Sequence, residues 1–231
     1  MFRTTRWSLI AAAGSTAGPD RSQALADLCR LYWYPVYAHV RRRTPDPHKA
    51  EDLTQAFFAR LLEKNDLSAA DPARGKFRTF LLSACQHFLA NQHDHDTAQK
   101  RGGGVVLLPI NFGEGEERFT REPAVRVTPE AEFERRWAMA LLDQTLKELR
   151  AEYAEAGKGK LFDALKGLLA GDTTPYRELG QLLGLTEGAV KVAVHRLRQR
   201  YREKLRAVIA ETVETPAAID DEIRDLFAAL G

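Results

Sequence analysis

The chain has 231 residues, of which 44% are hydrophobic and 29% charged, with a net charge of +2; this balance is typical of a globular protein and excludes a disordered one. No apolar run approaches the roughly 18 residues that cross a bilayer, so we expect no membrane insertion. Two cysteines, Cys29 and Cys85, are too few for a disulfide scaffold or a paired-cysteine zinc site, and they favour a reduced, cytoplasmic protein.

The small net charge conceals two oppositely charged segments. Residues 186–206 contain seven basic and two acidic residues, a net charge of +5, whereas residues 211–231 contain one basic and six acidic residues, a net charge of −5. Polyanions are the natural partners of such a basic segment.

Helical spacing of apolar residues dominates the first hundred residues. It predicts a helix over residues 22–43, which Pro35 should kink or split, and a second over residues 49–63 with Leu53, Phe57 and Leu61 on its buried side. A third helix should begin near Lys76 and fade before residue 100.

Glycines and prolines then replace the periodic pattern between residues 101 and 128, which we predict to be a linker. Helical pattern resumes afterwards. The sequence therefore predicts an all-α protein with two helical domains joined by a flexible linker: residues 1–100, a linker at 101–128, residues 129–210, and an acidic tail at 211–231 that can form a short amphipathic helix.

Residues 175–201 carry the most specific local pattern. Gly184 stands where a positive φ would end a short helix, and Thr186 is a suitable cap for the next one. That next helix should bury its apolar face and expose a basic one; the apolar face consists of Val190, Val194, Leu197, Tyr201 and Leu205. A short helix, a glycine turn and a capped basic helix are typical of the helix-turn-helix that enters a DNA major groove, and a solvated surface helix is the alternative.

Three stretches of the sequence carry a family resemblance. Residues 50–61 (AEDLTQAFFARL) and 75–81 (GKFRTFL) resemble two consecutive helices of bacterial RNA polymerase sigma factors of the extracytoplasmic-function (ECF) type, and residues 176–198 are similar to the carboxy-terminal promoter-reading domain of the same family. The resemblance covers most of residues 20–210. It implies a sigma region 2-like domain before the linker and a region 4-like helix-turn-helix domain after it, in a transcription-initiating polymerase subunit that is not an enzyme and needs no cofactor.

The resemblance also implies partners and contact residues. The partners are core RNA polymerase and promoter DNA, with an anti-sigma factor as a further candidate. Binding of the core enzyme is assigned to Glu51, Asp52, Thr54, Gln55, Phe58 and Arg60. Recognition of the −10 promoter element is assigned to Lys76, Arg78, Gln86, His87 and Asn91. Recognition of the −35 element is assigned to Thr186, Glu187, Ala189, Lys191, His195, Arg196 and Arg198.

Two regulatory hypotheses follow. The family usually has an acidic residue where this chain has Ala56, so phosphorylation of Thr54 by a Ser/Thr kinase would restore the missing negative charge; an ordinary surface threonine is the alternative. The acidic tail would dock on the basic second domain and mask its DNA-binding surface, and a simple packing extension is the alternative.

Two other functions fit parts of the sequence. A dimeric helix-turn-helix regulator would bind a palindrome without being a polymerase subunit. A metal site at His93 and His95 is disfavoured, because two residues of spacing turn these side chains to different sides of a helix. No serine or cysteine has a neighbouring base in the sequence, so we expect no catalysis.

Overall fold

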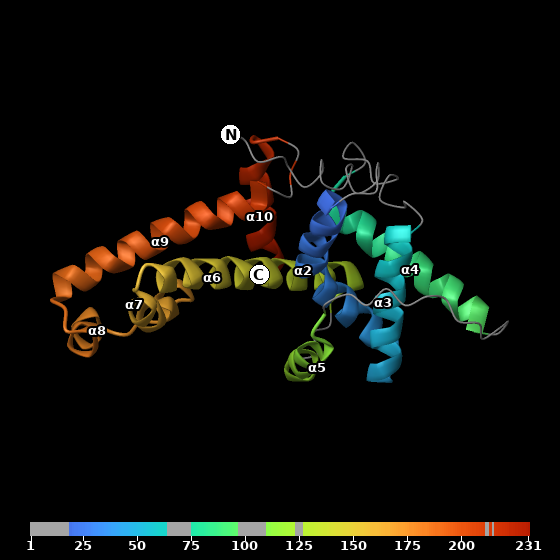
Figure 1. Cartoon of the computed structure of the whole chain (residues 1–231), viewed down its shortest axis with the longest axis horizontal. Helices are drawn as coiled ribbons and strands as arrows, with labels where there is room; N and C mark the ends of the chain where they lie inside the picture. Colours follow the sequence, from blue (N-terminus) through green and yellow to red (C-terminus); the bar gives the residue numbers. More distant parts are fainter. Residues whose placement is uncertain (1–18, 64–74, 97–109, 123–126, 211–212, 214) are drawn as a thin grey trace. The chain divides into compact units, whose positions relative to one another are not determined.

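The computed structural model describes residues 19–63, 75–96, 110–122, 127–210, 213 and 215–231. All regular structure in these ranges is helical, which confirms the predicted all-α class (Figure 1). The chain divides into two compact units: unit 1 comprises residues 1–140 and 210–231, and unit 2 comprises residues 141–209. None of the helices in the described ranges is long and apolar enough to cross a membrane.

Unit 1 is built on three helices that pack on one another: α2 (Pro19–Arg41), α3 (Pro47–Glu63) and α4 (Phe77–Asp96). Their shared core consists of buried apolar side chains, among them Val36, Tyr37, Val40, Phe57, Phe58, Leu61, Leu81, Cys85 and Phe88. α2 continues through Pro35 instead of splitting there. The flanking Tyr34 and Val36 are buried, and this packing outweighs the hydrogen bond that proline removes.

Both cysteines are free thiols in the core of unit 1, as predicted. Burial raises the pKa of Cys29 and of Cys85 to about 12. Buried, protonated thiols are unreactive, so these residues serve as small apolar side chains.

A helix lies inside the segment expected to be an irregular linker. α5 (Phe112–Arg121) packs on α2, with the Phe112 ring centroid 5.5 Å from that of Tyr37. A Cβ atom on Gly115 would lie 2.8 Å from the Trp33 ring, so glycine permits this close approach. The structure differs from the expectation because the partners of α5 lie more than 70 residues earlier, where no local pattern reveals them.

α6 (Pro129–Glu155) begins in unit 1 and ends in unit 2. The hydroxyl of Thr128 accepts a hydrogen bond from the amide of Ala131 over 3.2 Å, which caps its first turn. Its first half buries Phe133 and Trp137 in unit 1, and its second half buries Leu149 in unit 2.

Unit 2 also contains α7 (Gly159–Leu165), a 3-10 turn η3 (Lys166–Leu169), α8 (Tyr176–Leu183) and most of α9 (Glu187–Ala210). Its core is one apolar cluster formed by Leu149, Phe162, Leu165, Leu168, Leu179, Val190, Val194 and Leu197. The buried spacing predicted for α9 is confirmed, since Val190, Val194, Leu197 and Leu205 are at most 5% exposed and Tyr201 is half-buried.

The tail forms the predicted helix, α10 (Ala218–Leu230), and belongs to unit 1. Leu226 anchors it, with a fully buried side chain. The carboxylates of α10 pair with residues at the start of α4, so the expectation that this tail docks on the basic second domain is not what the structure shows. The net charges of residues 186–206 and 211–231 do not reveal that Lys76 and Arg78, outside the basic segment, are the partners of α10.

Candidate functional site

The exposed side of α3 carries a polar strip. Asp52 is exposed and Glu51, Gln55 and Arg60 are half-buried at the surface, as expected for residues that contact a partner. Arg60 stands at the edge of the strip, where it lines a cavity together with the core residues Phe57 and Leu61. This strip can accept a partner surface of mixed polar character.

Thr54 and Phe58 do not belong to that strip. Both side chains are 0% exposed, and the Thr54 hydroxyl donates a hydrogen bond to the carbonyl oxygen of Ala50 over 2.7 Å. The expectation of an accessible Thr54 is therefore corrected. The sequence held the signal, because positions 50, 54, 57, 58 and 61 follow the spacing of one helix face.

The residues predicted on α4 separate into two groups. Lys76, His87 and Asn91 are exposed and Gln86 is half-buried. Arg78 is 3% exposed: its guanidinium carbon lies 4.0 Å from the Trp137 ring centroid, and its nitrogens pair with Glu134 and Glu222. The structure thus buries Arg78, which the resemblance assigns to DNA.

A cavity of about 340 Å³ lies between α3 and α4. His87 and Asn91 line it on one side and Arg60 on another, over an apolar floor that includes Phe57 and Phe88. The Arg60 guanidinium carbon lies 5.9 Å from the Phe88 ring centroid. The fold therefore brings a residue predicted to bind polymerase beside two residues predicted to bind the −10 element.

Lys76 stands at the start of α4 and contacts α10. Its Nζ lies 3.2 Å from a carboxylate oxygen of Glu222 and also pairs with Asp225. The hydrogen bond from Lys76 lowers the pKa of Asp225 below its usual value. Sequence analysis missed this contact, because the paired residues are 149 positions apart.

The turn between α8 and α9 has the geometry that the glycine and threonine predict. Gly184 has φ of 65°, and the amide of Leu185 donates to the carbonyl oxygen of Gly180 over 2.9 Å. The hydroxyl of Thr186 accepts from the amide of Ala189 over 3.2 Å, which caps α9. The short α8 and the long α9 are thereby joined by a tight turn, and the side chains of Thr186, Glu187 and Ala189 beside it are exposed.

All residues predicted to read the −35 element are exposed on this part of unit 2; they are Thr186, Glu187, Ala189, Lys191, His195, Arg196 and Arg198. The guanidinium group of Arg198 also donates a hydrogen bond to the carbonyl oxygen of Leu168 in η3 over 3.2 Å. Three large apolar side chains are exposed on the same part of unit 2: Leu182 (74%), Leu185 (40%) and Val192 (50%). Helical spacing predicts that Leu182 is buried beside Leu179, and the structure shows that this prediction is wrong.

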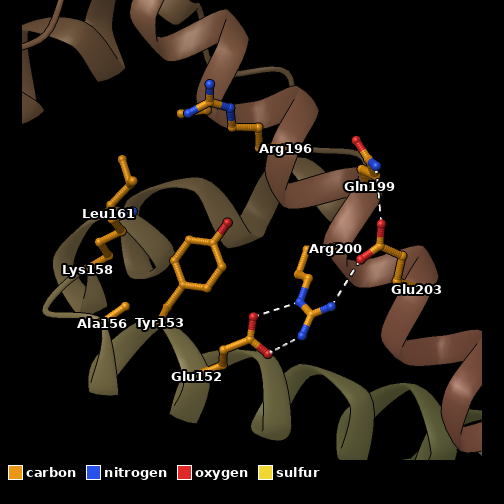
Figure 2. Close-up of a pocket in the computed structure, with 10 residues that line it drawn as sticks. Glu152, Tyr153, Ala156, Lys158, Leu161, Arg196, Gln199, Arg200 and Glu203 are labelled. Carbon is orange, nitrogen blue, oxygen red and sulfur yellow. Dashed lines mark hydrogen bonds and ion pairs between the residues drawn. The ribbon is translucent and has the colours of Figure 1, made fainter.

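A second cavity, of about 390 Å³, lies in unit 2 between the end of α6, the start of α7 and α9 (Figure 2). At one end, Arg200 makes two hydrogen bonds to Glu152, of 2.6 and 2.9 Å, and Lys204 pairs with the same carboxylate at 3.0 Å. These cations lower the pKa of Glu152 to about 2. Figure 2 shows Arg196 apart from this cluster, so it stays available to a ligand while Arg200 is engaged.

Residues 30–94 match the Sigma-70 region 2 family. They form a sigma-70 region 2 domain. This domain contains the end of α2, all of α3 and most of α4, and therefore every residue predicted to bind polymerase or the −10 element. The family is not enzymatic.

A curated relative, the ECF RNA polymerase sigma factor SigE of Mycolicibacterium smegmatis, is 28% identical over 190 residues, which are 82% of this chain. The chain spans 64% of the length of that relative. No solved structure gives a significant match.

The side chains of His93 and His95 lie outside the described residues, and the rest of the described chain contains no group of three potential metal ligands.

Proposed function

We propose that this protein is an ECF-type sigma factor, which directs core RNA polymerase to specific promoters and initiates transcription. The observation that carries this proposal is the region 2 domain at residues 30–94. The similarity to a curated ECF sigma factor over 82% of the chain supports the same function for the remainder. In this role the protein binds both the promoter and the core polymerase, and so positions the polymerase on the promoter.

The second part of the proposal is a region 4-like helix-turn-helix over residues 129–210 that reads the −35 element. The capped start of α9 is exposed, and its polar side chains have the length to reach base edges in a major groove. Arg196 and Arg198 stand further along the helix, where cations contact phosphates and set the register. Together with the net charge of +5 over residues 186–206, this arrangement supports duplex binding.

The third part is the polymerase contact. Asp52 and the half-buried Glu51, Gln55 and Arg60 form the accessible strip of α3, while Thr54 and Phe58 support it from the core. Because an acidic strip pairs with a basic partner surface, replacing Asp52 with lysine should repel that surface. Glu117, exposed on α5, offers a matched charge reversal elsewhere in the unit.

The test is a pull-down with core RNA polymerase followed by run-off transcription on a candidate promoter. We expect wild type and Glu117→Lys to bind the core enzyme and Asp52→Lys to bind at least tenfold more weakly, a difference of about 1.4 kcal/mol. In transcription, Lys191→Ala should lose promoter activity, and Lys160→Ala, an exposed lysine on α7, should keep it. Dimerisation and palindrome binding without any affinity for core polymerase would support the alternative of a conventional regulator.

A further inference from the structure

The α10 helix makes both a buried ion pair and a solvent-exposed ion pair with residues at the start of α4. Glu222, whose side chain is 7% exposed, pairs with the buried Arg78, and Leu226 is fully buried. Asp225, whose side chain is 48% exposed, pairs with Lys76, whose side chain is 40% exposed. The first contact anchors the helix, and the second lies where solvent can compete for it.

Lys76 is the accessible cation at this end of the region 2 domain. A carboxylate at ion-pair distance from its ammonium group occupies the place that a phosphate oxygen of a DNA strand would take, because both are anionic acceptors for the same donor. An exposed ion pair contributes little stability, so a polyanion that releases its own counterions can replace it. Arg78 has Glu134 and Trp137 as further contacts, so it stays compensated when α10 shifts.

We propose that α10 competes with the promoter strand for the region 2 domain. In the free chain, Lys76 pairs with the exposed Asp225 and with the buried Glu222. In the DNA complex, a backbone phosphate takes the place of the Asp225 carboxylate. This inference rests on the proposed function, because Lys76 must contact DNA for the competition to matter. It places the inhibitory contact of the acidic tail on region 2.

The same helix supplies a matched control. Asp221 pairs with Arg224 of α10 itself at 2.9 Å, and both side chains are largely exposed. Asp225→Asn and Asp221→Asn each remove one negative charge from α10, but only the first removes a partner of Lys76, which then keeps Glu222 at 3.2 Å as its remaining partner on α10. A difference between them therefore reports on the contact and not on the total charge of the tail.

The experiment measures binding of the full chain, without polymerase, to a fluorescein-labelled single-stranded oligonucleotide of about 20 residues by anisotropy at low salt. We expect Asp225→Asn to bind about fivefold more tightly than Asp221→Asn, with a steeper dependence on salt. In a Lys76→Ala background, the advantage of Asp225→Asn should vanish. Circular dichroism and a thermal melt confirm that each variant is folded.

Equal affinities of the two variants would overturn the proposal, and so would an advantage that persists without Lys76. The proposed function is tested separately by the wild-type chain with core polymerase. If that complex transcribes while the two variants bind DNA equally, only the competition is wrong. If the wild type has no affinity for the core enzyme, the sigma-factor assignment itself fails.

Discussion

Gly180 and Leu185 pack so closely that a Cβ atom on Gly180 would lie 2.6 Å from the carbonyl oxygen of Leu185. That oxygen belongs to the backbone of the turn between α8 and α9, and it cannot move without displacing the start of α9. Glycine at position 180 is therefore a requirement of the turn.

We expect Gly180→Ala to lower the free energy of unfolding of unit 2 by about 1–3 kcal/mol, because overpacking forces the backbone to shift. Gly188→Ala is the control: no atom lies within 4 Å of its Cβ position, and alanine in the first turn of α9 should raise stability by about 0.5–1 kcal/mol. Denaturant unfolding measures both. Similar stabilities for the two variants would show that the turn has room for a methyl group.

Glu116 holds α5 on α2. Its carboxylate accepts a hydrogen bond from the Tyr37 hydroxyl over 2.6 Å and pairs with Arg41 at 2.9 Å, and the hydrogen bond from Arg41 is the main reason that its pKa is lowered. Glu116→Gln should lower the free energy of unfolding of unit 1 by about 1–2 kcal/mol and speed hydrogen exchange over residues 112–121.

The neighbouring Glu117, 60% exposed and paired with Arg121 on its own helix, serves as the comparison for Glu116. Glu117→Gln should change stability by less than about 0.5 kcal/mol. If both variants exchange at the same rate over residues 112–121, α5 is held by its apolar contacts alone.

His39 is buried as a neutral side chain. It is 4% exposed, and burial, followed by the charge of Arg43, lowers its pKa from 6.5 to about 4. The unfolded chain then binds more protons than the folded chain between these values, so stability should fall as the pH drops from 6.5 towards 4, by up to about 3 kcal/mol.

Chemical denaturation across this pH range tests the prediction for His39. His39→Gln should flatten the dependence, whereas His48→Gln, which alters a 90% exposed side chain, should leave it as steep as in the wild type. An unchanged slope in His39→Gln would assign the acid sensitivity to other groups.

Thr54 tests the phosphorylation hypothesis against the packing of α3. Because its side chain is 0% exposed, Thr54→Asp should lower the free energy of unfolding by about 3 kcal/mol or more, whereas Thr54→Val, which keeps the shape, should cost less than about 1 kcal/mol. Thermal melts measure both. If Thr54→Asp melts like the wild type and binds core polymerase more tightly, the position accepts a charge and regulation by a kinase regains support.

The sequence by itself determined the helical class, the inner face of α9, the buried positions of Phe57 and Leu61 on α3, and the capped turn after Gly184. Each of these depends on residues within about two turns of one another, so spacing and turn chemistry specify them locally. The burial of Thr54 was not predicted, because the resemblance assigned this residue to the polymerase contact. Its register with Phe57 and Leu61 is nevertheless visible in the sequence.

Only the tertiary structure decided which charged residues remain accessible. Lys76 and Arg78 are only two positions apart in the sequence. Arg78 is buried among Glu134, Glu222 and Trp137, whereas Lys76 is exposed and pairs with Asp225 at the surface. The same holds for α5, where Glu116 pairs with Tyr37 and Arg41 of α2, whereas Glu117 pairs with Arg121 on its own helix. The physical reason is that ion pairs and desolvation depend on distance in space, and the partners here are separated by 56 to 149 residues of chain.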